Sequence, residues 1–515
     1  MVIMCLKVRI GYFYSVIIRN FAVCFPKGIM SIFNRLRSEE PSIIVSLVPI
    51  VVLLVGLAVM IVHSGADAAQ QWGPMMLATA AAVCVLLTVV FTKKSAHDMW
   101  VGLRRSATQL LPAMPILVLI GTLSATWMLS GVVPAMIDYG LAVLSPNAFL
   151  VTTCAVCAAV SVLSGSSWTT IATIGVAFMG VGTVMGYSAG WTAGAIISGA
   201  YFGDKMSPLS DTTVLASSSC GVGLFSHIRN MIYTSMPALA IAMVVYGIAG
   251  FCVDAVGADA DATEMIHVIE RTFNITPWLM IIPAVTCMML ALKMGTVKTL
   301  TAGTFAGLVG MWVFQPELMD SLGGVDFGSD VWLSVKVLLT STEPSTGNEI
   351  LDSLAATGGV AGMLPTVLLV FCAMLFGGAM IGSGMLAVIA RKITARLHSV
   401  QSLVGATVCS GLCLNMLTGD QYLSIIIGGN IYSDPYQRVG ADKKVLSRAL
   451  EDSVSVTSVL IPWNSCGLTQ STVLGVATLT YLPYCVFNIL SPFMSIVAIW
   501  SVRLFASKRV ALRKR

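Results

Sequence analysis

Long apolar runs dominate the sequence, and short polar segments separate them. Each run holds about 15 to 22 residues with almost no charge, the length that an α-helix needs to cross a hydrocarbon core. In the first two thirds of the chain these runs cover residues 43–62, 75–91, 110–128, 232–253, 278–292 and 300–314. The pattern predicts an all-α polytopic membrane protein with about ten to twelve transmembrane spans over the whole chain.

Four shorter apolar pieces interrupt this regularity. They cover residues 132–144, 148–163, 168–185 and 191–202, and Ser-Gly, Gly-Tyr and Pro breaks separate them. Several are too short to cross a membrane alone. Broken helices of this kind mark the binding sites of transporters, because irregular backbone at membrane depth is tolerated only around a cavity or inside protein.

The second half of the chain echoes the first. Matching residues recur in the same order at nearly constant spacing: Leu111-Pro112 and Leu364-Pro365, Ser130-Gly131 and Ser383-Gly384, residues 163–168 and 417–422, and Asp211-Thr212 and Asp452-Ser453. Arg104 and Arg105 precede the Leu-Pro helix of the first copy, whereas Arg391 and Lys392 follow that of the second. The copies are therefore expected to cross the membrane in opposite directions, as inverted structural repeats.

Charge and repeats together predict the organisation of the chain. Its parts are a basic N-terminal extension (1–40), an N-terminal helical pair (41–106), the first repeat (107–255), connecting spans with an external acidic loop (256–360), the second repeat (361–506) and a basic tail (507–515). The positive-inside rule places both termini in the cytoplasm. The basic loop at residues 432–448 conflicts with the inverted topology, so its side of the membrane stays open.

Composition excludes a soluble globular domain. Of 515 residues, 57% are hydrophobic and only 10% are charged, whereas soluble domains carry about 25% charged residues. The 13 cysteines are scattered without the spacing of a zinc site, so we interpret them as small apolar residues. The net charge of +5 resides at the ends of spans, which predicts a lipid bilayer as partner and no nucleic acid.

Polar groups within apolar surroundings mark the candidate site. The segment 203–213 carries two carboxylates, a lysine and a proline, and such groups are costly in hydrocarbon unless they are partnered. The residues expected to bind Na⁺ and H⁺ are Asp204, Asp211, Thr212, Asp420, Glu451, Asp452, Ser453, Thr457 and Asn464. Oxygen atoms suit hard cations, and a carboxylate takes either a cation or a proton. We expect Na⁺ at Asp211 and Asp452, because these two occupy matching positions of the repeats.

Other roles are open for some of these residues, and enzymatic chemistry is not expected. Asp204 and Lys205 can form an internal ion pair, and Glu451 can face the basic loop. Residues 186–190 match a hydrolase nucleophile motif, but they join two apolar helices rather than a strand and a helix. Zinc-protease, Walker A and dinucleotide motifs are absent. We expect no enzyme and no cofactor, with Na⁺ and H⁺ as transported ions.

Several segments resemble the signature of the NhaC family of Na⁺/H⁺ antiporters. They are residues 198–213 (SGAYFGDKMSPLSDTT), 224–229 (LFSHIR), 346–349 (TGNE), 446–453 (LSRALEDS) and 461–467 (IPWNSCG). The similarity covers about residues 41–505 and implies a secondary antiporter of the bacterial inner membrane with re-entrant hairpins. The family includes malate–lactate antiporters. Val214 departs from the Asn common at this position and removes a potential oxygen ligand.

Two transport functions fit these observations. The first is exchange of Na⁺ for H⁺ by alternating access. The alternative is Na⁺- or H⁺-coupled exchange of organic acids, with Ser217, Ser218, Ser219, Asn464 and Ser465 holding the substrate carboxylate. The apolar spans contain no arginine to pair with a dicarboxylate, which favours the first. The duplicated carboxylates disfavour a non-transporting assembly or sensor. The oligomeric state, including a homodimer, stays open.

Overall fold

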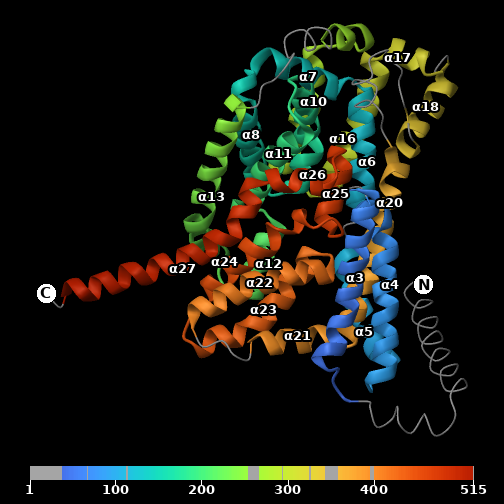
Figure 1. Cartoon of the computed structure of the whole chain (residues 1–515). Helices are drawn as coiled ribbons and strands as arrows, with labels where there is room; N and C mark the ends of the chain where they lie inside the picture. Colours follow the sequence, from blue (N-terminus) through green and yellow to red (C-terminus); the bar gives the residue numbers. More distant parts are fainter. Residues whose placement is uncertain are drawn as a thin grey trace, which may run out of the picture.

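The chain is described by a computed structural model that covers residues 38–65, 68–111, 114–252, 266–292, 294–323, 326–340, 342, 358–394 and 399–513. Most of the expected N-terminal extension (1–37) and parts of the expected external acidic regions (253–265 and 343–357) lie outside the described residues. Every regular element within the described ranges is a helix (Figure 1).

Helices of very different lengths alternate along the chain. Those of the first half are α3 (Ile43–Ser64), α4 (Ala68–Phe91), α5 (Ala96–Leu110), α6 (Met114–Leu129), α7 (Val132–Val143), η2 (Pro146–Ala148), α8 (Phe149–Ser164), α9 (Ser167–Thr170), η3 (Ile171–Gly175), α10 (Val176–Val184), α11 (Ala189–Met206), α12 (Asp211–Ser219) and α13 (Leu224–Cys252). The connecting region holds η4 (Pro277–Met280), α15 (Ile281–Ala291), α16 (Thr296–Phe314), α17 (Pro316–Ser321) and α18 (Phe327–Leu339). The second half holds α20 (Gly359–Gly382), α21 (Met385–Thr394), α22 (Val400–Thr418), α23 (Gln421–Arg438), α24 (Lys443–Leu450), η5 (Glu451–Ser455), η6 (Ser458–Leu460), α25 (Ser465–Leu474), α26 (Thr478–Tyr481), η7 (Leu482–Tyr484) and α27 (Val486–Arg513).

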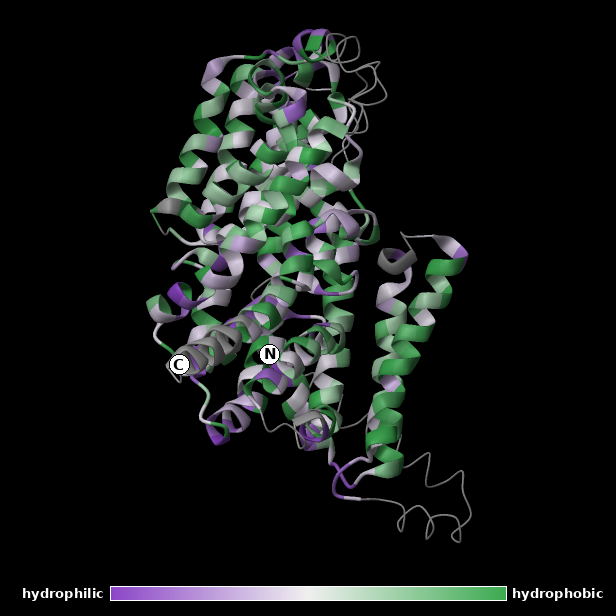
Figure 2. Ribbon diagram, turned by 60° about the vertical axis from the view of Figure 1, so that its left-hand side comes forward, coloured by the Kyte–Doolittle hydropathy of each residue, from purple (hydrophilic) through white to green (hydrophobic). Residues whose placement is uncertain are grey.

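The lengths and hydropathy of these helices are those of a polytopic membrane protein. Within the described residues, 8 helices are long and apolar enough to cross a membrane, and the number reaches 11 if each of three sharply bent pairs counts as one span. Figure 2 shows hydrophobic residues along most of the long helices. The α6–α7 pair bends by 66° at Ser130-Gly131. The predicted polytopic α-helical class with broken helices is confirmed, whereas the inverted relation of the halves stays a prediction.

Close packing of α8 against α11 positions the signature segment. A Cβ atom at Gly199 would lie 2.2 Å from the carbonyl oxygen of Cys154, and one at Gly203 would lie 2.4 Å from that of Ala158. Glycine lets the two backbones approach, which is how helices associate where lipid offers no hydrophobic driving force. The last turn of α11, which carries Asp204 and Lys205, is thereby held against the end of α8.

Three buried hydrophobic clusters form the core of the described residues, and two of them connect helices that are far apart along the chain. The larger extends from α3 to α27 and runs through α6, α8, α11 and α20. The smaller joins α12 of the first half to α22, α23 and α24 of the second through residues such as Ala216, Tyr432 and Leu450. The short helix α12 therefore packs on the second half of the chain, although it follows α11 directly in sequence.

Candidate functional site

Four interrupted helices build the centre of the molecule. The breaks lie at residues 165–166, between α8 and α9; at 207–210, between α11 and α12; at 419–420, between α22 and α23; and at 461–464, between η6 and α25. Gly165 and Gly419 end their helices in the left-handed conformation, with φ of 69° and 65°, which glycine adopts without steric cost. The helices that follow are capped by side-chain oxygens of Ser166, Ser210 and Asp420, among others.

A cavity of about 450 Å³ opens beside the first three of these breaks. Its lining residues are Ile116, Ser164, Gly165, Ser166, Trp168, Asp204, Pro208, Leu209, Asp211, Thr212, Leu290, Gly295, Thr296, Gln421 and Tyr422. Among the described residues of this lining, Asp204 and Asp211 are the charged ones and none is basic. The wall is thus negatively charged and rich in oxygen atoms, which suits a cation.

The two cavity carboxylates differ in their hydrogen bonding. Asp204 accepts a hydrogen bond of 2.6 Å from the hydroxyl of Ser167, at the start of α9. Asp211 is the first residue of α12 and is exposed toward the cavity. The described part of the chain gives the Asp211 carboxylate no hydrogen-bond partner. Asp211 is therefore the carboxylate whose oxygens are free for an incoming ion.

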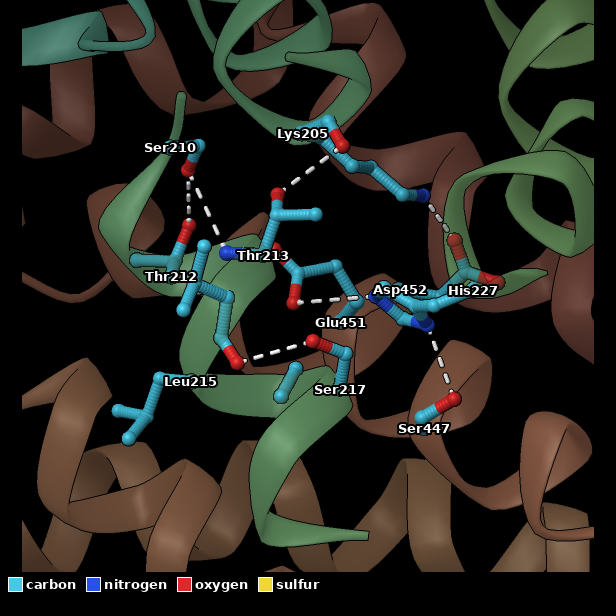
Figure 3. Close-up of polar contacts among 12 residues, drawn as sticks. Lys205, Ser210, Thr212, Thr213, Leu215, Ser217, His227, Ser447, Glu451 and Asp452 are labelled. Carbon is cyan, nitrogen blue, oxygen red and sulfur yellow. Dashed lines mark hydrogen bonds and ion pairs between the residues drawn. The ribbon is translucent and has the colours of Figure 1, made fainter. Parts of the chain in front are cut away.

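Asp452 lies elsewhere, in a fully buried ion pair with Lys205 (Figure 3). One oxygen of Asp452 also accepts hydrogen bonds from Thr234 at 3.2 Å and Ser491 at 3.0 Å, and the other accepts from Ser495 at 2.5 Å. Asp452 does not line the cavity. The structure accordingly brings Asp211 together with Asp204 rather than with Asp452, and it pairs Lys205 with Asp452 rather than with Asp204.

The other carboxylates proposed from sequence, Asp420 and Glu451, lie outside the cavity lining. Asp420 is buried and caps α23, accepting from the backbone of Leu423 at 2.9 Å and from Ser465 at 3.2 Å. It sits next to Gln421, which lines the cavity. Glu451 is completely buried and does not line it.

The neutral candidates are mostly engaged in hydrogen bonds within helices. Ser453 donates to the carbonyl oxygen of Ala449 at 2.6 Å, and Thr457 donates to that of Ser453. Asn464 caps α25 through the backbone of Cys466. Ser217, Ser218 and Ser219 donate to carbonyl oxygens three residues earlier in α12. Of the neutral candidates, Thr212 is the one in the cavity lining.

Sequence reasoning missed several residues that shape this region. Trp168, Gln421 and Tyr422 line the cavity, and all three belong to the repeated motif at 163–168 and 417–422. That repetition was a usable signal. The hydroxyls around Asp452 lie on α13 and α27, in ordinary apolar helices, and no local pattern marks them.

Comparison with known proteins assigns the family. The sequence model of the Na⁺/H⁺ antiporter family matches residues 37–220 and 199–501. The chain belongs to this family. The two matched stretches of the antiporter family model include every residue of the cavity lining.

Relatives within the Na⁺/H⁺ antiporter family are named for the transport of different substrates. The Na⁺/H⁺ antiporter NhaC of Alkalihalophilus pseudofirmus is 35% identical over 382 residues, which cover 74% of this chain and 80% of the relative. The malate-2H⁺/Na⁺-lactate antiporter of Bacillus subtilis is 35% identical over 375 residues, covering 73% and 78%. The arginine/ornithine antiporter ArcD of Halobacterium salinarum is 33% identical over 469 residues, covering 89% and 92%. These relatives are all antiporters, and the chain is a multi-pass membrane protein of the same family.

Proposed function

We propose that this protein is a secondary antiporter that exchanges Na⁺ for H⁺ across the bacterial inner membrane by alternating access. The observation that carries the proposal is the cavity at the helix breaks, whose charged lining residues are Asp204 and Asp211. The matched family and the NhaC relatives support the same ions. The distribution of basic residues supports a cytoplasmic location for both termini.

The two cavity carboxylates explain why Na⁺ and H⁺ exclude each other. Two carboxylates in one cavity repel, so a proton or a cation stabilises them. Carboxylate, hydroxyl and backbone oxygens can coordinate Na⁺, and all three kinds occur around Asp211. A proton on one carboxylate removes the charge that holds Na⁺. Moving an unneutralised charge through the membrane costs about 2.5–3.5 kcal/mol on insertion scales, so the site crosses loaded with one ion or the other.

The charge of the cavity also ranks the alternatives. Organic acids such as malate and lactate would meet two carboxylates and, among the described lining residues, no basic side chain, so the malate–lactate alternative is disfavoured. An organic cation is the second candidate. The cavity volume of about 450 Å³ lies within the about 300–1,000 Å³ that small-molecule pockets occupy, and the aromatic rings of Trp168 and Tyr422 suit a cation. The arginine/ornithine relative fits this candidate.

Everted membrane vesicles with an internal pH probe test the proposal. We expect a pH response to Na⁺ alone, and no requirement for malate, lactate or arginine. Asp211→Asn keeps the size of the side chain but removes its charge, so it should abolish exchange, and Asp204→Asn should at least weaken Na⁺ binding. Glu317→Gln is the matched control, because Glu317 is exposed on α17, away from the cavity.

Each result points to a different conclusion. A pH response that requires malate or lactate would contradict the proposal, and one that requires arginine would favour the organic-cation candidate. Full activity of Asp211→Asn at wild-type protein levels would remove the cavity carboxylate from the mechanism. The amount of each variant in the membrane, measured by the fluorescence of a fused reporter, shows whether a loss of activity comes from poor insertion.

A further inference from the structure

Glu451 is a buried carboxylate that does not line the cavity. The π-helix η5 turns two consecutive acidic side chains into the protein in different directions: Asp452 toward Lys205 and Glu451 toward His227 (Figure 3). Glu451 and His227 are both 0% exposed. Both carboxylate oxygens of Glu451 and Nε2 of His227 lack a hydrogen-bond partner in the described part of the chain. Glu451 Oε2 and His227 Nε2 face each other across 3.9 Å.

The hydrogen bonds of His227 indicate where its proton resides. Ser447 donates its hydroxyl proton to the carbonyl oxygen of Lys444 at 3.2 Å, and its oxygen lies 2.8 Å from Nδ1 of His227. A hydroxyl that donates to a carbonyl accepts from Nδ1, so Nδ1 carries the hydrogen of the neutral imidazole. Nε2 is then an acceptor that faces Glu451. A carboxyl group that carries a proton can donate to this nitrogen, whereas an ionised carboxylate has nothing to accept from it.

Charged and titratable groups surround Glu451 on every side. They are Asp204 and Lys205 of α11, Cys220 directly after α12, His227 of α13, and Arg448 and Asp452 of its own helical segment. Lys205 is already paired with Asp452. Among the described residues, no lysine or arginine lies within ion-pair distance of Glu451. A buried carboxylate without a counterion is costly to ionise, so this arrangement favours a bound proton.

We propose that the Glu451–His227 pair binds a second transported proton, in addition to the one that competes with Na⁺ in the cavity. The inference rests on the Na⁺/H⁺ antiport proposed above and assigns it two protons for each Na⁺. Thr212, which lines the cavity next to Asp211, is near Glu451 but makes no hydrogen bond with it. On the side away from the cavity, His227 contacts Ser447 of α24. Lys443 at the start of the same helix is exposed, so this contact gives the proton a route toward the surface.

The proton transfers balance without any further reagent. The O–H proton of Glu451 passes to Nε2 of His227, which leaves a carboxylate and an imidazolium. The imidazolium gives up its Nδ1 proton by way of Ser447 to water at the surface. Net transport then requires that Glu451 takes its next proton from the cavity and that the imidazole returns to its Nδ1–H tautomer, because reversal of the two steps would draw the next proton from the same surface. At 3.9 Å the donor and acceptor are farther apart than in a hydrogen bond. Because His227 and Glu451 lie on different elements, a small shift of α13 against η5 makes or breaks the contact.

Stoichiometry in proteoliposomes tests this assignment. We would reconstitute wild type, Glu451→Gln, Glu451→Asp and the control Glu317→Gln, impose a Na⁺ gradient at zero membrane potential, and find the pH gradient that stops net transport. With two protons for each Na⁺, the wild-type protein balances a given Na⁺ gradient with half the pH gradient that a one-proton exchanger needs. A potential imposed with valinomycin and K⁺ should change the rate of the wild type.

The variants separate a transported proton from a structural role. Glu451→Gln should still exchange Na⁺ for H⁺, but with double the balancing pH gradient and no response to the potential. Glu451→Asp should restore the wild-type balance. An electroneutral wild type would overturn the assignment, as would an unchanged balance in Glu451→Gln or loss of all its Na⁺ transport. Absence of Na⁺-driven proton movement in wild type would instead overturn the proposed function, and it is recognised without any variant.

Discussion

Lys205 places a positive charge where neither water nor lipid headgroups reach it, since its side chain is 1% exposed. Asp452 neutralises this charge, and three hydroxyls fill the remaining positions of the Asp452 carboxylate. The aliphatic stem of Lys205 also brings its nitrogen to 5.8 Å from the ring centre of Phe487. Both partners were recognisable in the sequence as costly intramembrane charges. Their pairing was not, because 247 positions separate them.

Removing one partner of this ion pair should destabilise the protein more than removing both charges. Asp452→Asn leaves a buried ammonium group without a counterion, and Lys205→Met leaves a buried carboxylate; each is expected to lower stability by about 3–5 kcal/mol. The double variant, which buries no unpaired charge, should lose less stability than either single variant. The stabilities of the wild type, the two single variants and the double variant can be compared by heating each protein in detergent and measuring the folded fraction by size-exclusion chromatography. Strictly additive losses would show that the pair does not interact.

At the scale of the element, the breaks were predictable and the π-helices were not. The Ser-Gly and Thr-Gly pairs at residues 164–165 and 418–419 predict the ends of helices, and both glycines adopt the left-handed conformation. Nothing in the composition of residues 171–175 or 451–455 marks an extra residue in the turn. Such turns arise from tertiary packing and are frequent at functional sites. The second of them decides that Glu451 and Asp452 are both buried.

Gly165 should be irreplaceable for two independent reasons, which Gly475 allows us to separate. An alanine at either position meets the left-handed penalty of about 1–2 kcal/mol, because φ is 69° at Gly165 and 66° at Gly475. A Cβ at Gly165 would also lie 2.6 Å from Cβ of Leu209, whereas at Gly475 nothing lies within 4 Å. Gly165→Ala should therefore lose both stability and exchange activity, whereas Gly475→Ala should lose only the stability of the left-handed penalty and keep its exchange activity. If the two variants lost the same vesicle transport activity and the same stability in thermal unfolding, this reasoning would be contradicted.

At the scale of the whole molecule, apolar runs and charge asymmetry were sufficient for the membrane class, whereas the cavity required the assembled halves. Asp204 and Asp211 come from the first half of the chain, but Gln421 and Tyr422 come from the second. Matching positions in the repeats suggested Asp211 with Asp452, and the packed structure gives Asp211 with Asp204. The repeat pattern relates equivalent positions, and equivalent positions need not touch.

The charge of the assembled cavity makes the Na⁺ affinity of the whole exchanger depend on pH with a defined sign. At least one proton must leave for each Na⁺ that binds, so lowering the pH should raise the half-saturating Na⁺ concentration by at least about tenfold for each pH unit over the acidic range. Exchange is then fastest on the alkaline side. Initial rates in proteoliposomes, with equal pH inside and outside and a range of Na⁺ concentrations, measure this dependence. A half-saturating concentration that stays constant while only the maximal rate falls would show that protons do not compete with Na⁺ for the Asp204–Asp211 cavity.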